Sequence, residues 1–284
     1  MLLALASLLL AAASSQDPRA GAEPDGNKLV KVELVSERAK LHPGEHFTLA
    51  AKLTVTPRWH IYWGENPGET GTPTRLEIEA PKEFTLGAPQ FPVPQRHEDP
   101  GPLVSYVYEG QALVLFDAVA PAKLEPGSKV RFELSASWLV CTSRCFQGEG
   151  EAALELECAA AGEPVPANEG LFKDARTKLP RKLEELKKLD AKLLGDPTKP
   201  EACQLELSVP GALELSFLPA EQKDLVFDSA TAKGSGEELR LVLDYHWSAP
   251  PQGKVEFGCP GILSVKTKDG TASYWFDKKF LAGH

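Results

Sequence analysis

Two cysteines separated by three residues are the feature of this 284-residue sequence that most directly indicates chemistry. Cys141 and Cys145 enclose Thr142, Ser143 and Arg144, and they follow a long run of alternating apolar residues. Cys141 breaks the alternation of that run, so we expect both cysteines to lie at a turn or on an exposed rim. A pair at this spacing can bind a metal, form a structural disulfide or form a redox-active disulfide.

The residues around the pair bear on each of these alternatives. Zinc would need two further ligands, and no second pair of His or Cys residues has the usual spacing. A structural disulfide that pins a hairpin is the common role of cysteine pairs in exported proteins. A redox-active disulfide is favoured by the short loop, which restricts the geometry of the bond, and by Arg144, whose charge stabilises a thiolate. Spacing alone leaves both kinds of disulfide open.

The other three cysteines lie in phase with inward-facing apolar positions, so we expect them to be buried. Cys158 ends one alternating series, Cys203 begins another and Cys259 ends a third. We predict a structural disulfide between Cys203 and Cys259, which would stabilise its domain by about 4 kcal/mol, and a free thiol at Cys158. The competing pairing, Cys158 with Cys203, would connect two domains.

The rest of the sequence excludes several classes of function. It contains no Ser-His-Asp signature, glycine-rich phosphate loop or paired-carboxylate motif that would indicate a hydrolase or a nucleotide-dependent enzyme. With 31 basic and 40 acidic residues the net charge is −9, which is unsuited to binding nucleic acid or an anionic membrane. The expected partners are proteins or small molecules, and we expect neither a cofactor nor a metal.

Alternating apolar residues predict the elements that must position the cysteine pair. Runs such as residues 47–55 and 130–140 place apolar side chains on one face, as half-buried strands do. Turn sequences, for example His42-Pro43-Gly44, separate the runs. About seven such strands between residues 27 and 160 predict an antiparallel β-sandwich of immunoglobulin-like type.

A different pattern follows the predicted sandwich. Residues 161–199 are predicted to be a linker with an amphipathic helix between Pro180 and Gly195, because leucines repeat there at helical spacing. These leucines are Leu183, Leu186, Leu189 and Leu193. Alternation resumes after Pro200 and predicts a smaller β domain over residues 200–284. The expected fold class is therefore mainly β.

The N-terminal residues indicate export. The first thirteen residues, MLLALASLLLAAA, form an apolar run of signal-peptide length, and the small residues after it suit cleavage before Gln16. We therefore interpret residues 1–15 as a signal peptide. No stretch reaches the roughly 20 apolar residues of a transmembrane helix. We expect a periplasmic or secreted bacterial protein without stable membrane insertion.

Four separate blocks of sequence resemble one known family. They are HIYWGENPGETGTP at 60–73, PQFPVPQR at 89–96, LVSYVYEG at 103–110 and SWLVCTSRC at 137–145. Their order and spacing over residues 30–158 are similar to those of the N-terminal periplasmic domain of the thiol:disulfide interchange protein DsbD and its relatives. The resemblance implies an immunoglobulin-like sandwich that acts as a thiol:disulfide oxidoreductase. Its cysteine pair would accept electrons from one partner and pass them to oxidised envelope proteins.

The resemblance also implies roles for particular residues. Cys145 would be the exchanging cysteine and Cys141 the resolving one, and the segment before the Tyr-x-Tyr block would form a cap over them. The better-known members space their cysteines more widely, and they continue into a transmembrane electron-transfer domain and a thioredoxin-like domain. Neither is found here, so we expect a separate thioredoxin-like or membrane electron-transfer protein as redox partner. The alternative is a non-catalytic β-sandwich that binds an envelope protein and keeps the disulfide only as a brace.

Residues in the same blocks could line the site. The candidates are Tyr62, Trp63, Tyr106, Tyr108 and Arg144. Aromatic residues before a turn are equally common in cores, so Tyr62 and Trp63 are open to either interpretation. We interpret His60 as a hydrogen-bonded structural residue rather than a base, and Glu109 as a carboxylate exposed at a turn.

Overall fold

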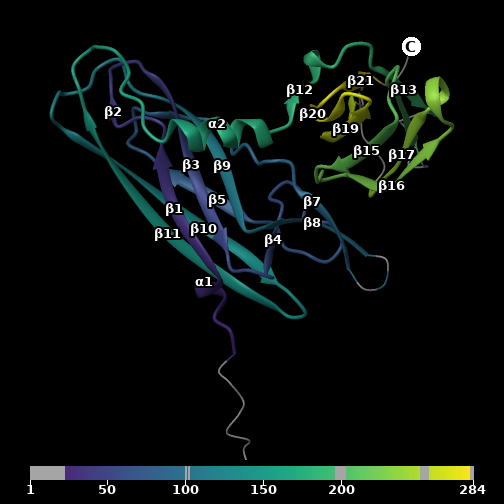
Figure 1. Ribbon diagram of the computed structural model, residues 1–284, viewed down its shortest axis with the longest axis horizontal. Coiled ribbons are helices and arrows are strands. Elements are labelled where there is room, and N and C mark those ends of the chain that lie inside the picture. Colours follow the sequence, from purple (N-terminus) through teal and green to yellow (C-terminus); the bar gives the residue numbers. More distant parts are fainter. Residues whose placement is uncertain (1–22, 100, 102, 196–202, 250–255, 282–284) are drawn as a thin grey trace, which may run out of the picture.

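The chain folds into two β domains, the first purple to teal and the second green to yellow in Figure 1. The computed structural model describes residues 23–99, 101, 103–195, 203–249 and 256–281. Strands dominate these residues, and the first domain is a sandwich of two sheets. The expected mainly β fold class is confirmed. The interpreted signal peptide, residues 1–15, lies outside the described residues.

Two sheets form the first domain. The smaller sheet contains, in spatial order, β1 (Val30–Ser36), β3 (His46–Val55), β9 (Gln111–Val119) and β6 (Thr85–Leu86). The larger sheet contains, in spatial order, β2 (Lys40–Leu41), β11 (Cys145–Cys158), β10 (Lys129–Cys141), β4 (His60–Tyr62), β8 (Leu103–Glu109) and β7 (Gln95–Asp99). A further strand, β5 (Arg75–Glu79), also pairs with β10.

The apolar residues that alternate in the sequence form the core between these sheets. In β10 every second side chain from Phe132 to Val140 is buried, and the intervening ones are exposed or partly exposed. Phe47 of β3 meets Phe132 edge to face, with ring centroids 6.1 Å apart. Such contacts join the sheets because each strand presents one apolar face to the other sheet.

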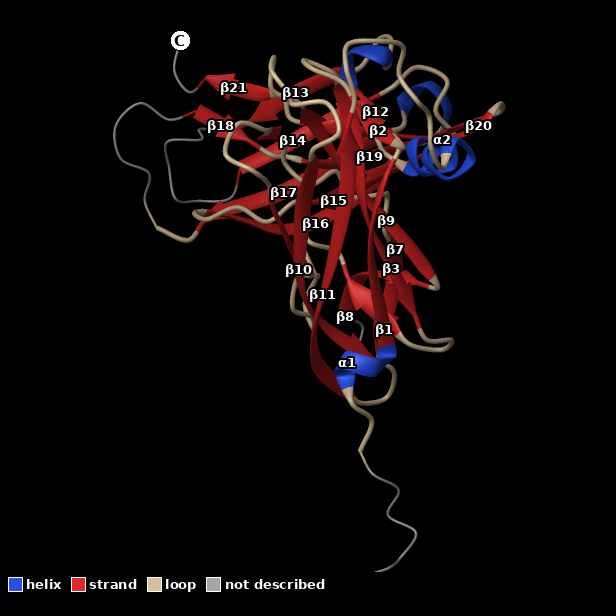
Figure 2. Ribbon diagram, turned by 90° about the vertical axis from the view of Figure 1, so that its left-hand side faces the viewer, coloured by secondary structure: helices blue, strands red, loops and turns tan. Residues whose placement is uncertain are grey.

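A long hairpin of β10 and β11 determines where the cysteine pair lies. The two strands pair without interruption from Lys129 opposite Glu157 to Cys141 opposite Cys145. Figure 2 shows this hairpin extending along the first domain toward the short helix α1 (Gly26–Leu29). Trp138 donates a hydrogen bond from Nε1 to the carbonyl oxygen of Gly26 over 3.3 Å. The N-terminal segment is therefore attached close to the tip of the hairpin.

The helix predicted between Pro180 and Gly195 is wrong. This segment forms β12 (Arg181–Lys182), the 3₁₀ turn η1 (Leu183–Glu185) and β13 (Asp190–Leu194). The helix of the connecting region lies earlier, as α2 (Glu169–Lys178). Its Phe172 and Ala175 pack on Leu113 and Leu115 of the smaller sheet.

The four leucines of this segment do not form one face of a helix. They are partly buried against the core of the second domain, where β13 pairs with β14 (Cys203–Ser208). Lys188, between η1 and β13, has a φ of 62°, which is incompatible with a continuous right-handed helix. A short isolated helix is marginal in water, so pairing with the edge of a sheet overrides the helical pattern.

The second domain is built from two four-stranded sheets and a short pair of strands. One sheet has the order β12, β20 (Gly270–Phe276), β19 (Gly261–Thr267) and β15 (Glu214–Pro219). The other has the order β13, β14, β17 (Arg240–Trp247) and β16 (Leu225–Lys233). The short pair is β18 (Glu256–Gly258) with β21 (Lys279–Leu281). The domain thus includes strands from the predicted linker.

The two domains share an apolar contact. Leu218, Ala220 and Ile262 of the second domain belong to the same buried cluster as Trp63 and Tyr106 of the sandwich. This contact lies beside the loop that follows β4, and Gly71 of that loop rests on the ring of Tyr62. Of the helices in the described ranges, none combines the length and apolar character needed to cross a bilayer.

Candidate functional site

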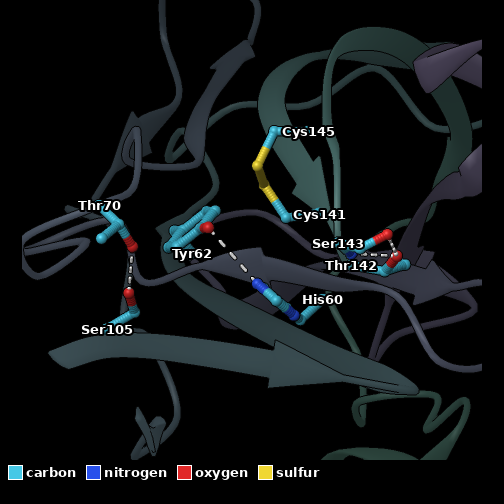
Figure 3. Close-up of a disulfide and its surroundings, with 8 residues drawn as sticks. All are labelled: His60, Tyr62, Thr70, Ser105, Cys141, Thr142, Ser143 and Cys145. Atoms are coloured by element: carbon cyan, nitrogen blue, oxygen red, sulfur yellow. Dashed lines mark hydrogen bonds between the residues drawn. A yellow bond between two sulfur atoms is a disulfide. The ribbon is translucent and has the colours of Figure 1, made fainter. Parts of the chain in front are cut away.

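The cysteine pair forms a disulfide at the tip of the long hairpin (Figure 3). Cys141 is the last residue of β10 and Cys145 the first of β11, and the two are register partners with Cα atoms 4.1 Å apart. Thr142 donates a backbone hydrogen bond to the carbonyl oxygen of Arg144 over 3.0 Å, which closes the turn between them. The pair therefore lies at a turn, where the sequence predicts it.

The two sulfur-bearing residues differ in exposure. Cys141 is only 1% exposed and packs with Tyr62 and Val107 in a small apolar cluster. Cys145 is exposed to solvent. Disulfide exchange proceeds by in-line attack on one sulfur, so an incoming thiolate has access from the side of Cys145.

Strand β4 pairs with the end of β10 that carries Cys141. His60 is the register partner of Cys141 on one side and of Glu109 on the other, so the three side chains project from the same face of the sheet. His60 is buried, and its Nε2 lies 3.4 Å from the hydroxyl oxygen of Tyr62. The ring of His97, from β7, lies 5.1 Å from the ring of His60.

Two glycines of the HIYWGENPGETGTP block shape the loop that passes over Tyr62. A Cβ added to Gly71 would lie 2.2 Å from Cδ1 of Tyr62, so the loop backbone rests directly on the tyrosine ring. Gly68 has a φ of 84°, and a Cβ there would lie 2.3 Å from the carbonyl oxygen of Val104. Only glycine allows both the left-handed conformation and this close approach.

The same loop is bonded to the start of β8. Glu69 donates its backbone N–H to the carbonyl oxygen of Val104 over 2.8 Å, and the Glu69 carboxylate accepts from the Val104 N–H over 3.2 Å. The hydroxyl oxygens of Thr70 and Ser105 lie 2.6 Å apart (Figure 3). The segment that the resemblance identifies as a cap includes β7, which pairs with β8. Its position therefore depends on the loop after β4.

Of the five residues suggested as lining, Tyr62 is the aromatic one that packs against Cys141. Trp63, Tyr106 and Tyr108 belong to the core on the opposite face of the sheet, which corrects the expectation that they line the site. The reason is strand alternation, since Tyr62 and Trp63 are neighbours in sequence and project to opposite faces. Burial raises the pKa of Tyr106 to about 12, as expected for a phenol in the core.

Arg144 interacts with two residues other than the cysteines. Its guanidinium forms an ion pair with Glu23 and lies over the ring of Phe146, 5.4 Å from the centroid. Both members of the ion pair are well exposed. The positive charge next to Cys145 is therefore partly compensated by Glu23, which weakens the expected stabilisation of a thiolate.

The three other cysteines are buried, as expected, and each carries a free thiol. The predicted Cys203–Cys259 bond and the competing Cys158–Cys203 bond are thus both unformed in this structure. Cys203 is the register partner of Tyr245, and Cys259 adjoins the same tyrosine. Burial raises the pKa of the Cys203 thiol to about 11, which makes it a poor nucleophile at neutral pH. Among the described residues, no three His, Cys, Asp or Glu side chains converge on a possible metal site.

The structure agrees with the interpretation of His60 as a hydrogen-bonded residue, and it is also buried. His97 was not singled out from the sequence. Only the pairing of distant strands brings its ring close to that of His60. The sequence does indicate that His60 lies near Tyr62, because residues two apart in a strand project from the same face.

The first domain is thus a disulfide-bearing β-sandwich in which Cys145 is exposed and Cys141 is buried at the tip of a hairpin. Residues 27–157 match the family model described as thiol:disulfide interchange protein DsbD, N-terminal. Over these residues the first domain of this chain is similar to the N-terminal domain of DsbD.

One solved structure extends the likeness beyond this domain. The N-terminal periplasmic domain of ScsB from Proteus mirabilis aligns over 89% of this chain and 92% of its own, with 13% identity and a TM-score of 0.58. The fold is therefore similar across a region larger than the first domain. A protein of unknown function from Porphyromonas gingivalis W83 covers 89% of this chain and 100% of its own at 8% identity, but its TM-score of 0.26 supports no comparison. No curated protein sequence matches the chain.

Proposed function

We propose that this chain is an exported thiol:disulfide oxidoreductase that passes electrons through Cys141 and Cys145 to or from other envelope proteins. The observation that carries the proposal is the asymmetric disulfide, with Cys145 exposed and Cys141 buried, in a domain similar to the N-terminal domain of DsbD. A disulfide that serves only as a brace has no need of one accessible sulfur.

The difference in exposure supports different roles for the two cysteines. A partner thiolate attacks Sγ of Cys145, the bond to Cys141 breaks, and the electron pair remains on Sγ of Cys141. The partner's second thiolate then attacks the mixed disulfide and releases Cys145, which leaves this chain with two thiols and the partner with a disulfide. Transfer to an oxidised protein follows the same steps in reverse, with Cys141 resolving the mixed disulfide.

The comparisons with DsbD and ScsB also support a proposed location and proposed partners. The ScsB domain is described as periplasmic, and residues 1–15 here would supply the signal for export. The redox partner would be a thioredoxin-like or membrane electron-transfer protein, and the other partners would be oxidised envelope proteins. Neither role requires a bound cofactor, because the electrons are carried by the two sulfurs.

Single-cysteine variants test this proposal. Cys141→Ser leaves Cys145 without its resolving partner, so it should accumulate mixed disulfides with envelope proteins. Cys145→Ser, which retains only the buried thiol, is the matched control and should trap little. Non-reducing electrophoresis of envelope extracts, with and without reductant, separates the two. If neither variant traps any protein, the alternative of a non-catalytic binding module replaces this proposal.

A further inference from the structure

His60 occupies the central position in a row of three side chains on neighbouring strands. It is opposite Cys141 of β10 and opposite Glu109 of β8, and all three project from the same face. Side chains that are directly opposite in an antiparallel pair have Cβ atoms about 4.5–5.5 Å apart. The His60 side chain is therefore flanked by those of Cys141 and Glu109 on the two neighbouring strands.

The groups around His60 come from four strands. Tyr62 is on its own strand, and the Tyr62 hydroxyl oxygen lies 3.4 Å from Nε2. His97 approaches from β7 with its ring 5.1 Å away. His60 is 5% exposed, whereas Glu109 is exposed to solvent at the end of β8. Figure 3 shows the imidazole on the side of the disulfide that carries Cys141.

We propose that His60 is the acid and base for Cys141 during exchange, an inference that rests on the proposed function. When a partner thiolate bonds to Sγ of Cys145, the bond between Cys145 and Cys141 breaks. The electron pair that remains on Sγ of Cys141 takes the proton of the His60 imidazolium. In the reverse direction the Cys141 thiol returns this proton to His60 and attacks Sγ of Cys145, which expels the partner's thiolate.

Burial is the reason why Cys141 needs such a group. A thiolate at a site that is 1% exposed loses most of its hydration, which disfavours its departure as an anion. A protonated imidazole beside it supplies both a proton and a compensating charge. The Glu109 carboxylate favours the protonated imidazole in turn, while the nearby ring of His97 disfavours it when that ring is also charged.

The test follows the reduction of the oxidised full chain by 2-mercaptoethanol between pH 5.5 and 8.5. Each rate constant is divided by the fraction of reagent present as thiolate, so that the remaining pH dependence belongs to the protein. For the wild type this corrected rate constant should fall about tenfold or more as pH rises through the imidazole titration. His60→Gln should give a flat profile, and the control His46→Gln, at an exposed position of β3, should follow the wild type.

A second variant keeps the proposal falsifiable if His60→Gln fails to fold. Glu109→Gln removes an exposed carboxylate and should move the fall in the corrected rate constant to lower pH. The same profile for the wild type, His60→Gln and Glu109→Gln would overturn the assignment of His60, as would an unshifted profile for Glu109→Gln alone. Because the reagent is a small thiol, these results do not depend on whether the chain traps envelope proteins, which tests the proposed function separately.

Discussion

Asn66 donates a hydrogen bond from Nδ2 to the carbonyl oxygen of Pro219 over 2.9 Å, and this bond joins the loop after β4 to the second domain. Oδ1 of the same side chain accepts the Gly68 N–H over 2.8 Å. A backbone bond of 2.9 Å from Glu221 to Glu65 lies beside it. The loop that rests on Tyr62 is therefore held by the second domain as well as by β8.

Asn66→Asp should remove the hydrogen bond to Pro219 and keep the one from Gly68. The carboxylate can still accept from Gly68, but it cannot donate to Pro219, so the domain contact should lose about 1 kcal/mol of stability. Urea unfolding should show a lower midpoint for this variant. Asn27→Asp is the matched control, because its Oδ1 accepts from the Glu149 N–H within the first domain and it keeps that acceptor. Equal midpoints for Asn66→Asp and the wild type would show that the contact adds no stability.

Gly71→Ala should disturb the site through sterics alone. The new methyl group would collide with the Tyr62 ring, at an expected cost of about 1–3 kcal/mol, and the displaced ring would expose Cys141. Thermal unfolding measures the cost, and alkylation of the reduced protein measures the exposure. Gly170→Ala is the control, because nothing lies within 4 Å of its Cβ position in α2. An unchanged alkylation rate for Gly71→Ala would mean that the loop does not control access.

Glu65 should make the domain contact depend on pH. Partial burial raises the pKa of its carboxyl group above the ordinary value, although Arg75 opposes this. A raised carboxyl pKa means that the ionised form is disfavoured in the folded state, so stability is lost as pH rises through this pKa. Glu65→Gln should therefore raise Tm at pH 7, and its advantage over the wild type should shrink toward pH 4. Glu77→Gln, at an exposed position of β5, provides the comparison. A Glu65→Gln advantage that is independent of pH would contradict this account.

Cys203 and Cys259 are expected to become bonded when the protein is exposed to an oxidising compartment. Both thiols are buried beside Tyr245, and a bond between them would stabilise the second domain by about 4 kcal/mol. Peptide mapping under non-reducing conditions should recover a Cys203–Cys259 peptide. Recovery of Cys158 joined to Cys203 instead would refute this pairing.

Local patterns predicted much of the first domain. Alternation along residues 130–140 is enough to identify β10, because one face of that strand is buried and the other is exposed. The break in phase at Cys141 likewise placed the pair at a turn. Both inferences use only neighbouring residues, so they do not depend on how distant strands pair.

Inferences that depend on distant pairing were the ones that failed. Leu183 and Leu193 have helical spacing, but the second domain buries them from separate elements, which no local pattern reveals. Tyr106 and Tyr108 share a motif with the site but project into the core. The contact of His60 with His97 arises because β4 and β7 both flank β8 in the larger sheet, and that order is a property of the fold.

The reduction potential of the Cys141–Cys145 bond tests the central claim most directly. The full chain is equilibrated with thiol buffers of known potential, and the oxidised fraction of this pair is measured by alkylation and mass spectrometry of its peptide. An exchange-active pair is predicted to have a potential well above about −300 mV, because exchange requires that the bond be readily reduced by a partner. A value at or below about −300 mV, typical of structural disulfides, would contradict the account and identify the bond as a brace.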